Sequence, residues 1–193
     1  MKAQTNQGFT IIESLVAITI LIIGVLGPMT AATRGITDGY YAQNQLIATH
    51  LAQEGLELLS TQIENNNNIR DADNDGDNDN DDFLVNLGPC IDPNRCALSV
   101  NLSTNSVDFS FSSCAVIGDC DMAFDEQSGF YRQLTGCVDC NFIGPVFRRT
   151  LTVEKLTTVA PIQVVLKSKI EWSNKSVPQS PIELSRYAFD KNQ

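Results

Sequence analysis

Hydrophobic side chains are concentrated in one block near the N-terminus. From Phe9 to Thr33 most residues are apolar, and Glu13 is the only ionisable side chain. As a helix this block would be roughly 37 Å long at about 1.5 Å per residue, which exceeds the ~30 Å hydrocarbon core of a bilayer. The pattern therefore predicts a membrane-spanning helix over residues 9–33.

A helical period of apolar positions continues from residue 34 to residue 63. Small and apolar residues recur there every three to four positions, and the polar Gln53, Glu54 and Glu57 lie between them. Such spacing is typical of a helix that buries one face. The residues expected on that face are Ala48, Ala52, Gly55, Leu59 and Ile63.

The C-terminal part of the chain instead alternates apolar and polar residues. The alternation is regular from Ile162 to Trp172, where Ser168 is the one polar exception, and less regular over residues 147–155 and 182–189. A period of two predicts half-buried strands, here forming an antiparallel sheet. Shorter extended segments are expected at residues 97–102, 107–111 and 130–134. We therefore predict an α+β fold, in which a long N-terminal helix packs its amphipathic half on an antiparallel β-sheet head.

The N-terminus resembles a secretory signal peptide in some respects. Residues 1–8 are polar with one lysine, Leu15 to Leu26 could form the apolar core, and a cut could follow near Ala31 or Ala32. Glu13 argues against this scheme. A carboxylate within a membrane segment costs about 2.5 to 3.5 kcal/mol, so it is retained where it has a partner.

A short motif favours a different scheme. The sequence GFTIIE at residues 8–13, followed by SLVAI at residues 14–18, resembles the cleavage and methylation signature of the type IV pilin and pseudopilin superfamily. The resemblance implies that a prepilin peptidase cuts between Gly8 and Phe9 and methylates the new Phe9 amine. It also implies that Glu13 pairs with that amine of a neighbouring subunit, because neither charge is satisfied alone in an apolar bundle.

The resemblance covers about residues 1–60 and extends to the rest only as architecture. It implies a subunit of a type IV pilus, or of a related secretion or DNA-uptake filament, that polymerises with other pilin subunits through its N-terminal helix. Such a subunit first spans the cytoplasmic (inner) membrane once with an exported head, and then joins a cell-surface or periplasmic filament. The large head favours a minor pilin or pseudopilin over a major pilin. The alternative is a membrane-anchored exported binding or adhesin domain.

An acidic insertion separates the predicted helix from the head. Residues 64–83 lose all hydrophobic periodicity and are rich in Asn and Asp, which predicts a loop. Within it, residues 71–82 follow the spacing of an EF-hand calcium loop, with Gly76 at position six. The candidate calcium ligands are Asp71, Asp73, Asp75, Asp77 through its carbonyl oxygen, Asp79 and Asp82.

Two positions depart from the EF-hand pattern. Position eight is Asn78 instead of an apolar residue, and position twelve is Asp82 instead of the longer glutamate. The loop therefore resembles an EF-hand-like or dockerin-like loop without a paired EF-hand domain. The alternative is a solvated acidic insertion. We favour calcium as the cofactor, because seven carboxylates within twelve residues repel one another unless a cation gathers them.

All six cysteines lie between Cys90 and Cys140, and this clustering indicates an oxidising compartment. Six cysteines in an exported head most simply form three disulfides, out of fifteen possible connectivities. A zinc site would need four thiolates, and although Cys137 and Cys140 could supply half of one, the other two pairs are spaced loosely for a zinc ribbon or knuckle. A redox Cys-x2-Cys normally opens a helix after a strand, a pattern absent from this part of the sequence. Pairing of sequence neighbours joins Cys90 to Cys96, Cys114 to Cys120 and Cys137 to Cys140.

Charge narrows the classes of partner and activity. The chain has 13 basic and 23 acidic residues, a net charge of -10, and its sequence has no basic stripe to offset phosphate charge. Nucleic acid is therefore not expected as a partner. The lone His50 has no serine or cysteine near it in a nucleophile context, so we expect no enzyme.

These patterns divide the chain into five parts. They are a leader at residues 1–8, a membrane or filament-core helix at 9–33, its amphipathic continuation at 34–63, the acidic calcium-loop-like insertion at 64–83, and a disulfide-containing β-rich head at 84–193.

Overall fold

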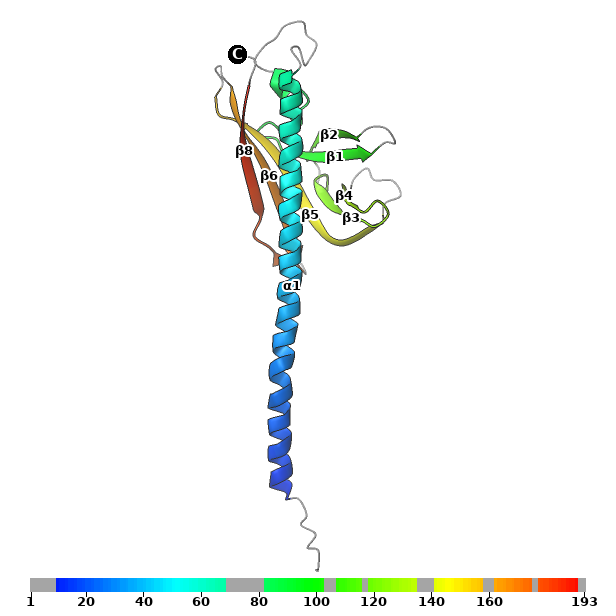
Figure 1. The fold of residues 1–193 in the computed structure, drawn as a ribbon, viewed down its shortest axis with the longest axis vertical. Coiled ribbons are helices and arrows are strands. Elements are labelled where there is room, and N and C mark those ends of the chain that lie inside the picture. The colour runs from blue at the N-terminus through cyan, green and yellow to red at the C-terminus, as the bar shows by residue number, and fades with distance from the viewer. Residues whose placement is uncertain are drawn as a thin grey trace, which may run out of the picture. The chain divides into compact units, whose positions relative to one another are not determined.

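The computed structural model describes residues 10–68, 82–102, 107–115, 118–134, 141–157, 162–174 and 177–190. The chain divides into two compact units, Met1–Gln43 and Asn44–Gln193. One helix, α1 (Ile11–Asn68), contributes its residues up to Gln43 to the first unit and its later residues to the second (Figure 1). The helix is continuous through Pro28.

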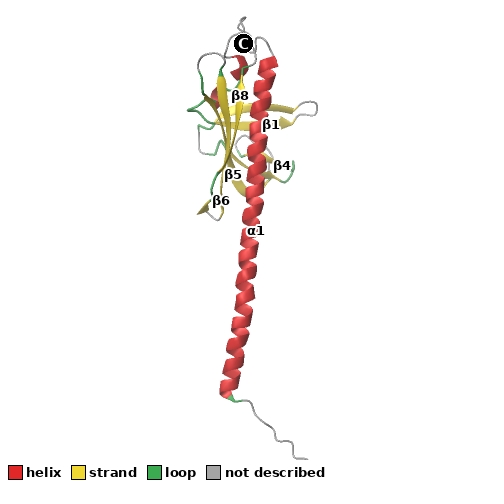
Figure 2. Ribbon diagram, turned by 60° about the vertical axis from the view of Figure 1, so that its left-hand side comes forward, coloured by secondary structure: helices red, strands yellow, loops and turns green. Residues whose placement is uncertain are grey.

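The second unit contains the sheet, and Figure 2 shows its strands beside the helix. After α1, the elements in chain order are η1 (Asp82–Leu84), η2 (Gly88–Cys90), β1 (Cys96–Leu102), β2 (Val107–Ser113), β3 (Asp121–Asp125), β4 (Phe130–Gln133), β5 (Phe142–Lys155), β6 (Gln163–Asn174), β7 (Val177–Pro178) and β8 (Ile182–Phe189).

The long strand β5 organises the sheet. Along one edge it pairs antiparallel with β6, which pairs in turn with β8 and with the short β7. Two strands share the other edge of β5. Cys96 of β1 pairs with Leu151 of β5, and β3 pairs with the earlier part of β5, beginning with Asp121 opposite Arg148. Two hairpins, β1–β2 and β3–β4, continue from these contacts. The predicted α+β fold with an antiparallel sheet is confirmed.

Most predicted strands are present at the expected places. The regular alternation after Ile162 forms β6, residues 182–189 form β8, and β5 begins at Phe142, earlier than the expected Phe147. The sequence analysis missed β3. This strand is only five residues long and ends in Asp125, which is buried and accepts hydrogen bonds from the backbone N–H groups of Gln127, Ser128 and Asn141.

The second half of α1 packs its apolar face on the sheet. Ala48, Ala52, Gly55, Leu59 and Ile63 are all buried, as the helical spacing predicted. The helix meets the sheet in two clusters. One joins Leu56, Leu59 and Ile63 to residues that include Phe83, Leu87, Leu151, Val153, Val164 and Leu166. The other joins Ala48, Leu51 and Ala52 to Met122, Phe147, Ile170 and Trp172.

The helix ends at Asn68 and not near Ile63, where the sequence analysis placed its end. The additional turn is held by side-chain amides. Asn66 donates hydrogen bonds from Nδ2 to the carbonyl oxygens of Phe83 and Val85, at 3.0 and 2.8 Å. Asn67 donates from Nδ2 to the carbonyl oxygen of Phe189 at 3.2 Å. These amides gain buried partners only when the chain remains helical through them, and this offsets the poor helix propensity of asparagine.

A buried cation also ties the helix to the sheet. Arg149 of β5 is 3% exposed, and its Nη1 lies 3.3 Å from Oε2 of Glu54 on α1. The guanidinium donates hydrogen bonds to the carbonyl oxygens of Leu51 on α1 and Leu98 on β1, each at 3.4 Å. Burial lowers the pKa of Arg149, and the charge of Glu54 opposes that shift. The cation therefore links α1, β5 and β1 at the point where β1 separates from β5.

Gly55 marks the closest approach of the helix to the sheet. A methyl group in its place would lie 2.9 Å from Cδ2 of Leu151, 2.9 Å from Oγ of Ser168 and 3.2 Å from Cδ of Arg149. The Ser168 hydroxyl, the polar exception noted in the alternating strand, is buried with no hydrogen-bond partner among the described residues. A glycine is needed here because the side chains below it are themselves confined.

We expect Gly55→Ala to lower the free energy of unfolding by roughly 1 to 2 kcal/mol, because the cost of overpacking exceeds the gain in helix propensity. Adding Ser168→Ala should recover part of this loss, since it removes one of the two closest atoms together with an unpartnered hydroxyl. The measurement is urea unfolding of the full chain in detergent. Gly39→Ala is the matched control, because a methyl group there would meet no described atom within 4 Å apart from its chain neighbours and the backbone of its own helix. Equal midpoints for Gly55→Ala and Gly39→Ala would contradict the expectation.

Candidate functional site

The first half of α1 exposes apolar side chains all around its circumference. Consecutive residues project about 100° apart on a helix, so the run from Ile20 to Ile23 alone covers every side. Apolar residues from Ile11 to Met29 are between 49% and 88% exposed. They are Ile11, Ile12, Leu15, Val16, Ile18, Ile20, Leu21, Ile22, Ile23, Val25, Leu26 and Met29.

By length and composition α1 is a candidate membrane span near the N-terminus. Signal sequences meet the same criterion, so the criterion does not by itself distinguish a permanent anchor from a removed leader. A helix that is apolar on every side requires apolar surroundings, which lipid or other apolar helices supply.

Thr10 caps the N-terminus of this helix. Its Oγ1 accepts a hydrogen bond from the backbone N–H of Glu13 at 3.3 Å, and its carbonyl oxygen accepts one from the backbone N–H of Ser14 at 3.2 Å. Thr10 is therefore the N-cap residue, and Glu13 occupies the third helical position. A threonine followed three residues later by glutamate is the residue pattern of a capping box.

The hydroxyl groups of the apolar segment form hydrogen bonds with the backbone of the same helix. Ser14, Thr19, Thr30 and Thr33 each donate a hydroxyl hydrogen bond to a carbonyl oxygen three or four residues earlier in the chain. The Glu13 carboxylate has no hydrogen bond or ion pair with any described residue. From Ile11 to Thr33, Glu13 is thus the one polar side chain of the described helix that still requires a partner.

The two predicted processing residues lie before the described part of the chain. Gly8 and Phe9 fall outside the described residues, and α1 begins at Ile11. The cut inferred from the pilin-like motif would therefore lie N-terminal to Thr10, the residue that caps the helix.

The predicted calcium loop also lies mostly outside the described residues. This applies to Asp71, Asp73, Asp75, Asp77 and Asp79, and to the side chain of Asp82. Its two flanks are described. Asn66, in the last turn of α1, donates hydrogen bonds to the carbonyl oxygens of Phe83 and Val85, so the two flanks of the insertion are held together. The described residues contain no cluster of three or more metal-ligating side chains.

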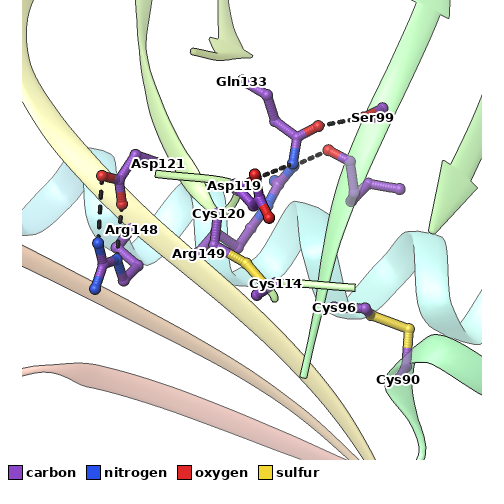
Figure 3. The surroundings of a disulfide bond; sticks show 11 residues. Cys90, Cys96, Ser99, Cys114, Asp119, Cys120, Asp121, Gln133, Arg148 and Arg149 are labelled. Carbon is purple, nitrogen blue, oxygen red and sulfur yellow. Dashed lines mark hydrogen bonds and ion pairs between the residues drawn. A yellow bond between two sulfur atoms is a disulfide. The ribbon is translucent and has the colours of Figure 1, made fainter. Parts of the chain in front are cut away.

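Four of the six cysteines form disulfides in the structure, and Figure 3 shows both bonds. Cys90 at the end of η2 joins Cys96 at the start of β1, with Cα atoms 4.7 Å apart. Cys114 joins Cys120 across the connection between β2 and β3, with Cα atoms 5.6 Å apart. Both bonds join sequence neighbours, as expected for these four residues. The predicted pair Cys137 and Cys140 lies outside the described residues.

Side-chain hydrogen bonds beside the second disulfide join the two hairpins (Figure 3). Nε2 of Gln133 on β4 donates to the carbonyl oxygen of Asp119 at 2.9 Å, and the Ser99 hydroxyl of β1 donates to Oε1 of Gln133. Arg148 and Asp121 form an ion pair at 2.7 Å on the neighbouring strands. The second disulfide therefore lies beside side-chain contacts that join the β1–β2 hairpin to the β3–β4 hairpin and β3 to β5.

Two residues of the candidate sites were missed by the sequence analysis. The cap at Thr10 had a readable signal, because its spacing to Glu13 matches the capping-box pattern. Asn66 had none. It belongs to a run of four asparagines, and nothing in that run distinguishes the member that turns toward Phe83.

Comparison with known proteins identifies no relative: no protein-family model, curated protein or solved structure matches the chain.

Proposed function

We propose that the chain is a structural subunit of a type IV pilus or of a related secretion or DNA-uptake filament. It is cut after Gly8 by a prepilin peptidase and assembles with other copies through the first half of α1. The observation that supports this most directly is the isolation of Glu13. Among the described residues from Ile11 to Thr33, its carboxylate is the one polar side-chain group without a partner, in a segment of α1 that exposes apolar side chains on every side.

The exposed apolar first half of α1 suits two successive apolar environments. Before assembly the lipid of the cytoplasmic membrane surrounds residues 11–33, which are roughly 34 Å long as a helix and so match one bilayer. In the filament, the same side chains pack against helices of neighbouring subunits. The head stays on the exported side, where its disulfides are stable.

Cleavage supplies the partner that Glu13 lacks. Hydrolysis of the Gly8–Phe9 amide leaves an ammonium group on Phe9, one residue before the helix cap. The N-terminus of a helix already carries partial positive charge, so this ammonium is unfavourable in an apolar bundle unless a carboxylate is close. Glu13 of an axially displaced copy provides that carboxylate, and each subunit then both donates and receives one ion pair.

The proposal predicts a defined N-terminus for the mature protein. Mass spectrometry of protein purified from membranes that contain prepilin peptidase should find a chain that begins at methylated Phe9. Gly8→Val should remain uncut, because a residue with a branched side chain obstructs entry of the backbone into a tight peptidase site. An intact Met1 would instead indicate an uncut anchor for an exported binding or adhesin domain. A terminus near Ala31 or Ala32 would indicate an ordinary signal peptide.

We further propose that the acidic insertion binds calcium. The support is the EF-hand spacing from Asp71 to Asp82, together with the hydrogen bonds of Asn66 that hold the two ends of the insertion close to each other. A loop whose ends are already fixed loses less conformational entropy when carboxylates gather around a cation. The ion would stabilise the connection between the helix and the sheet.

A further inference from the structure

The helix of the first compact unit carries three charged side chains. Between Ile11 and Gln43 they are Glu13, Arg34 and Asp38, and all three are exposed. None of the three forms a hydrogen bond or ion pair through its side chain with any described residue. The proposed function supplies a partner for Glu13 and leaves Arg34 and Asp38 without one.

Arg34 and Asp38 are one helical turn apart but do not pair with each other. In a helix, a pair of charges four residues apart is stronger when the acidic residue precedes the basic one, and here the order is reversed. The two charges follow directly after residues 11–33, which already match the thickness of one bilayer. Lipid phosphate at the membrane surface would attract Arg34 and repel Asp38, whereas a neighbouring helix with the same two charges satisfies both.

The spacing of these two charges repeats the spacing of the pair proposed for Glu13. Asp38 follows Arg34 by four residues, as Glu13 follows Phe9, and in both pairs the cation comes first. Asp38 lies 25 residues after Glu13. At about 3.6 residues per turn, this separation is within about 20° of seven complete turns. Because α1 is continuous through Pro28, the two carboxylates lie on the same face of one helix.

From this spacing we infer that Arg34 of each copy forms an ion pair with Asp38 of the next copy in the filament. The inference rests on the proposed function. A parallel copy displaced by four residues, about 6 Å along the helix axis, brings Arg34 beside Asp38 by the same displacement that brings the Phe9 amine beside Glu13. The contact is head-to-tail, so it repeats along an open filament. Apolar contacts are non-directional, and the two ion pairs would therefore fix the axial register at both ends of the apolar segment.

Charge reversal tests this pair in cells that carry the assembly machinery and lack the wild-type subunit. Arg34→Asp alone and Asp38→Arg alone should each reduce the amount of subunit in sheared filaments by about tenfold or more, since a close charge pair across an interface contributes at least about that factor to affinity. Arg34→Lys keeps the cation and should assemble close to the wild-type level. Glu57→Arg is the matched control, because Glu57 is an exposed charge of the same helix outside both proposed pairs. Its incorporation should equal that of the wild type.

Co-expression separates a contact between copies from a pair within one helix. Arg34→Asp presents two acidic side chains and Asp38→Arg presents two basic ones, so a mixed filament joins opposite charges wherever unlike copies meet. The two variants expressed together should therefore restore filaments that neither forms alone. Both reversals in one chain should also restore them. Restoration within one chain but not by co-expression would overturn the inference, because it would place the pair within a single helix.

The remaining outcomes distinguish this inference from the proposed function. Wild-type incorporation of either single reversal, or no recovery on co-expression, would overturn the inference while the wild-type chain still forms filaments. Loss of Arg34→Asp but not Asp38→Arg from the membrane fraction would assign Arg34 to lipid phosphate and would likewise overturn it. A wild-type chain that never enters filaments would overturn the proposed function itself.

Discussion

Glu13→Gln is expected to leave membrane insertion and cleavage intact while reducing incorporation into filaments by about two orders of magnitude or more. Removing one partner from a buried ion pair costs about 3 to 5 kcal/mol, because the other charge stays buried without compensation. In this variant the Phe9 ammonium of each copy would face a neutral amide. The apolar packing of residues 11–33 would be unchanged, so the loss would isolate the electrostatic contribution.

Glutamine is the informative replacement because of the helix cap. Glu13 occupies the third position of α1, behind Thr10, and glutamine serves at that position of a capping box as glutamate does. Glu13→Gln therefore preserves the helix start and removes only the charge, whereas Glu13→Ala changes both. If the glutamate were present only to support the cap, the glutamine variant would assemble normally.

The measurement compares sheared filament and membrane fractions from cells that carry the assembly machinery, with electron microscopy of the filaments. Glu57→Gln is the matched control, because Glu57 is an exposed glutamate in the second half of the same helix. Its incorporation should equal that of the wild type. Wild-type levels of Glu13→Gln in filaments would show that this carboxylate has no ionic partner there.

Calcium removal is expected to lower the thermal stability of the head. An ion that binds only the folded chain stabilises it by about 2.7 kcal/mol at one hundred times its dissociation constant. For a domain of this size, that corresponds to a rise of roughly 5 to 10 °C in melting temperature. The effect should reach the head because Asn66 joins the end of α1 to Phe83 and Val85, on either side of the insertion.

The measurement is a thermal melt of the full chain in detergent, with calcium or with a chelator. Asp73→Ala/Asp75→Ala should melt at the chelated temperature in both conditions. Asn78→Ala/Asn80→Ala is the matched control, because it alters the same loop at positions that supply no predicted ligand. Magnesium should substitute poorly, since it requires tighter octahedral geometry and retains its waters. Identical melting temperatures throughout, with no heat of calcium binding by calorimetry, would identify the insertion as a solvated linker.

Periodicity along the chain was sufficient to predict the main elements of this fold. The alternation at residues 182–189 matches β8, and the helical spacing of Ala48, Ala52 and Gly55 matches the face that α1 buries. These patterns are readable because the burial of one face imposes a local repeat, two residues in a strand and about 3.6 in a helix. Glu13 was recognisable for a related reason, as a single charge in an apolar block.

The boundaries of elements depended on contacts between distant residues. The last turn of α1 exists because Asn66 and Asn67 find carbonyl partners on Phe83, Val85 and Phe189, and the sequence separation of the last contact is 122 residues. An isolated run of asparagines favours a loop, so local propensity placed the C-terminal end of the helix too early in the chain. Tertiary hydrogen bonds outweighed that propensity.

The register of helix against sheet is also a tertiary property. Ser168 reads in the sequence as a polar exception in an apolar strand, and only the folded chain shows that it lies under Gly55 where a larger residue would not fit. The sequence around Arg149 does not distinguish it from an exposed arginine of a strand, and the Leu51 carbonyl oxygen that accepts its hydrogen bond is 98 residues away in the sequence. Close packing and the pairing of a buried charge are properties of which surfaces meet, and local sequence patterns do not encode that choice.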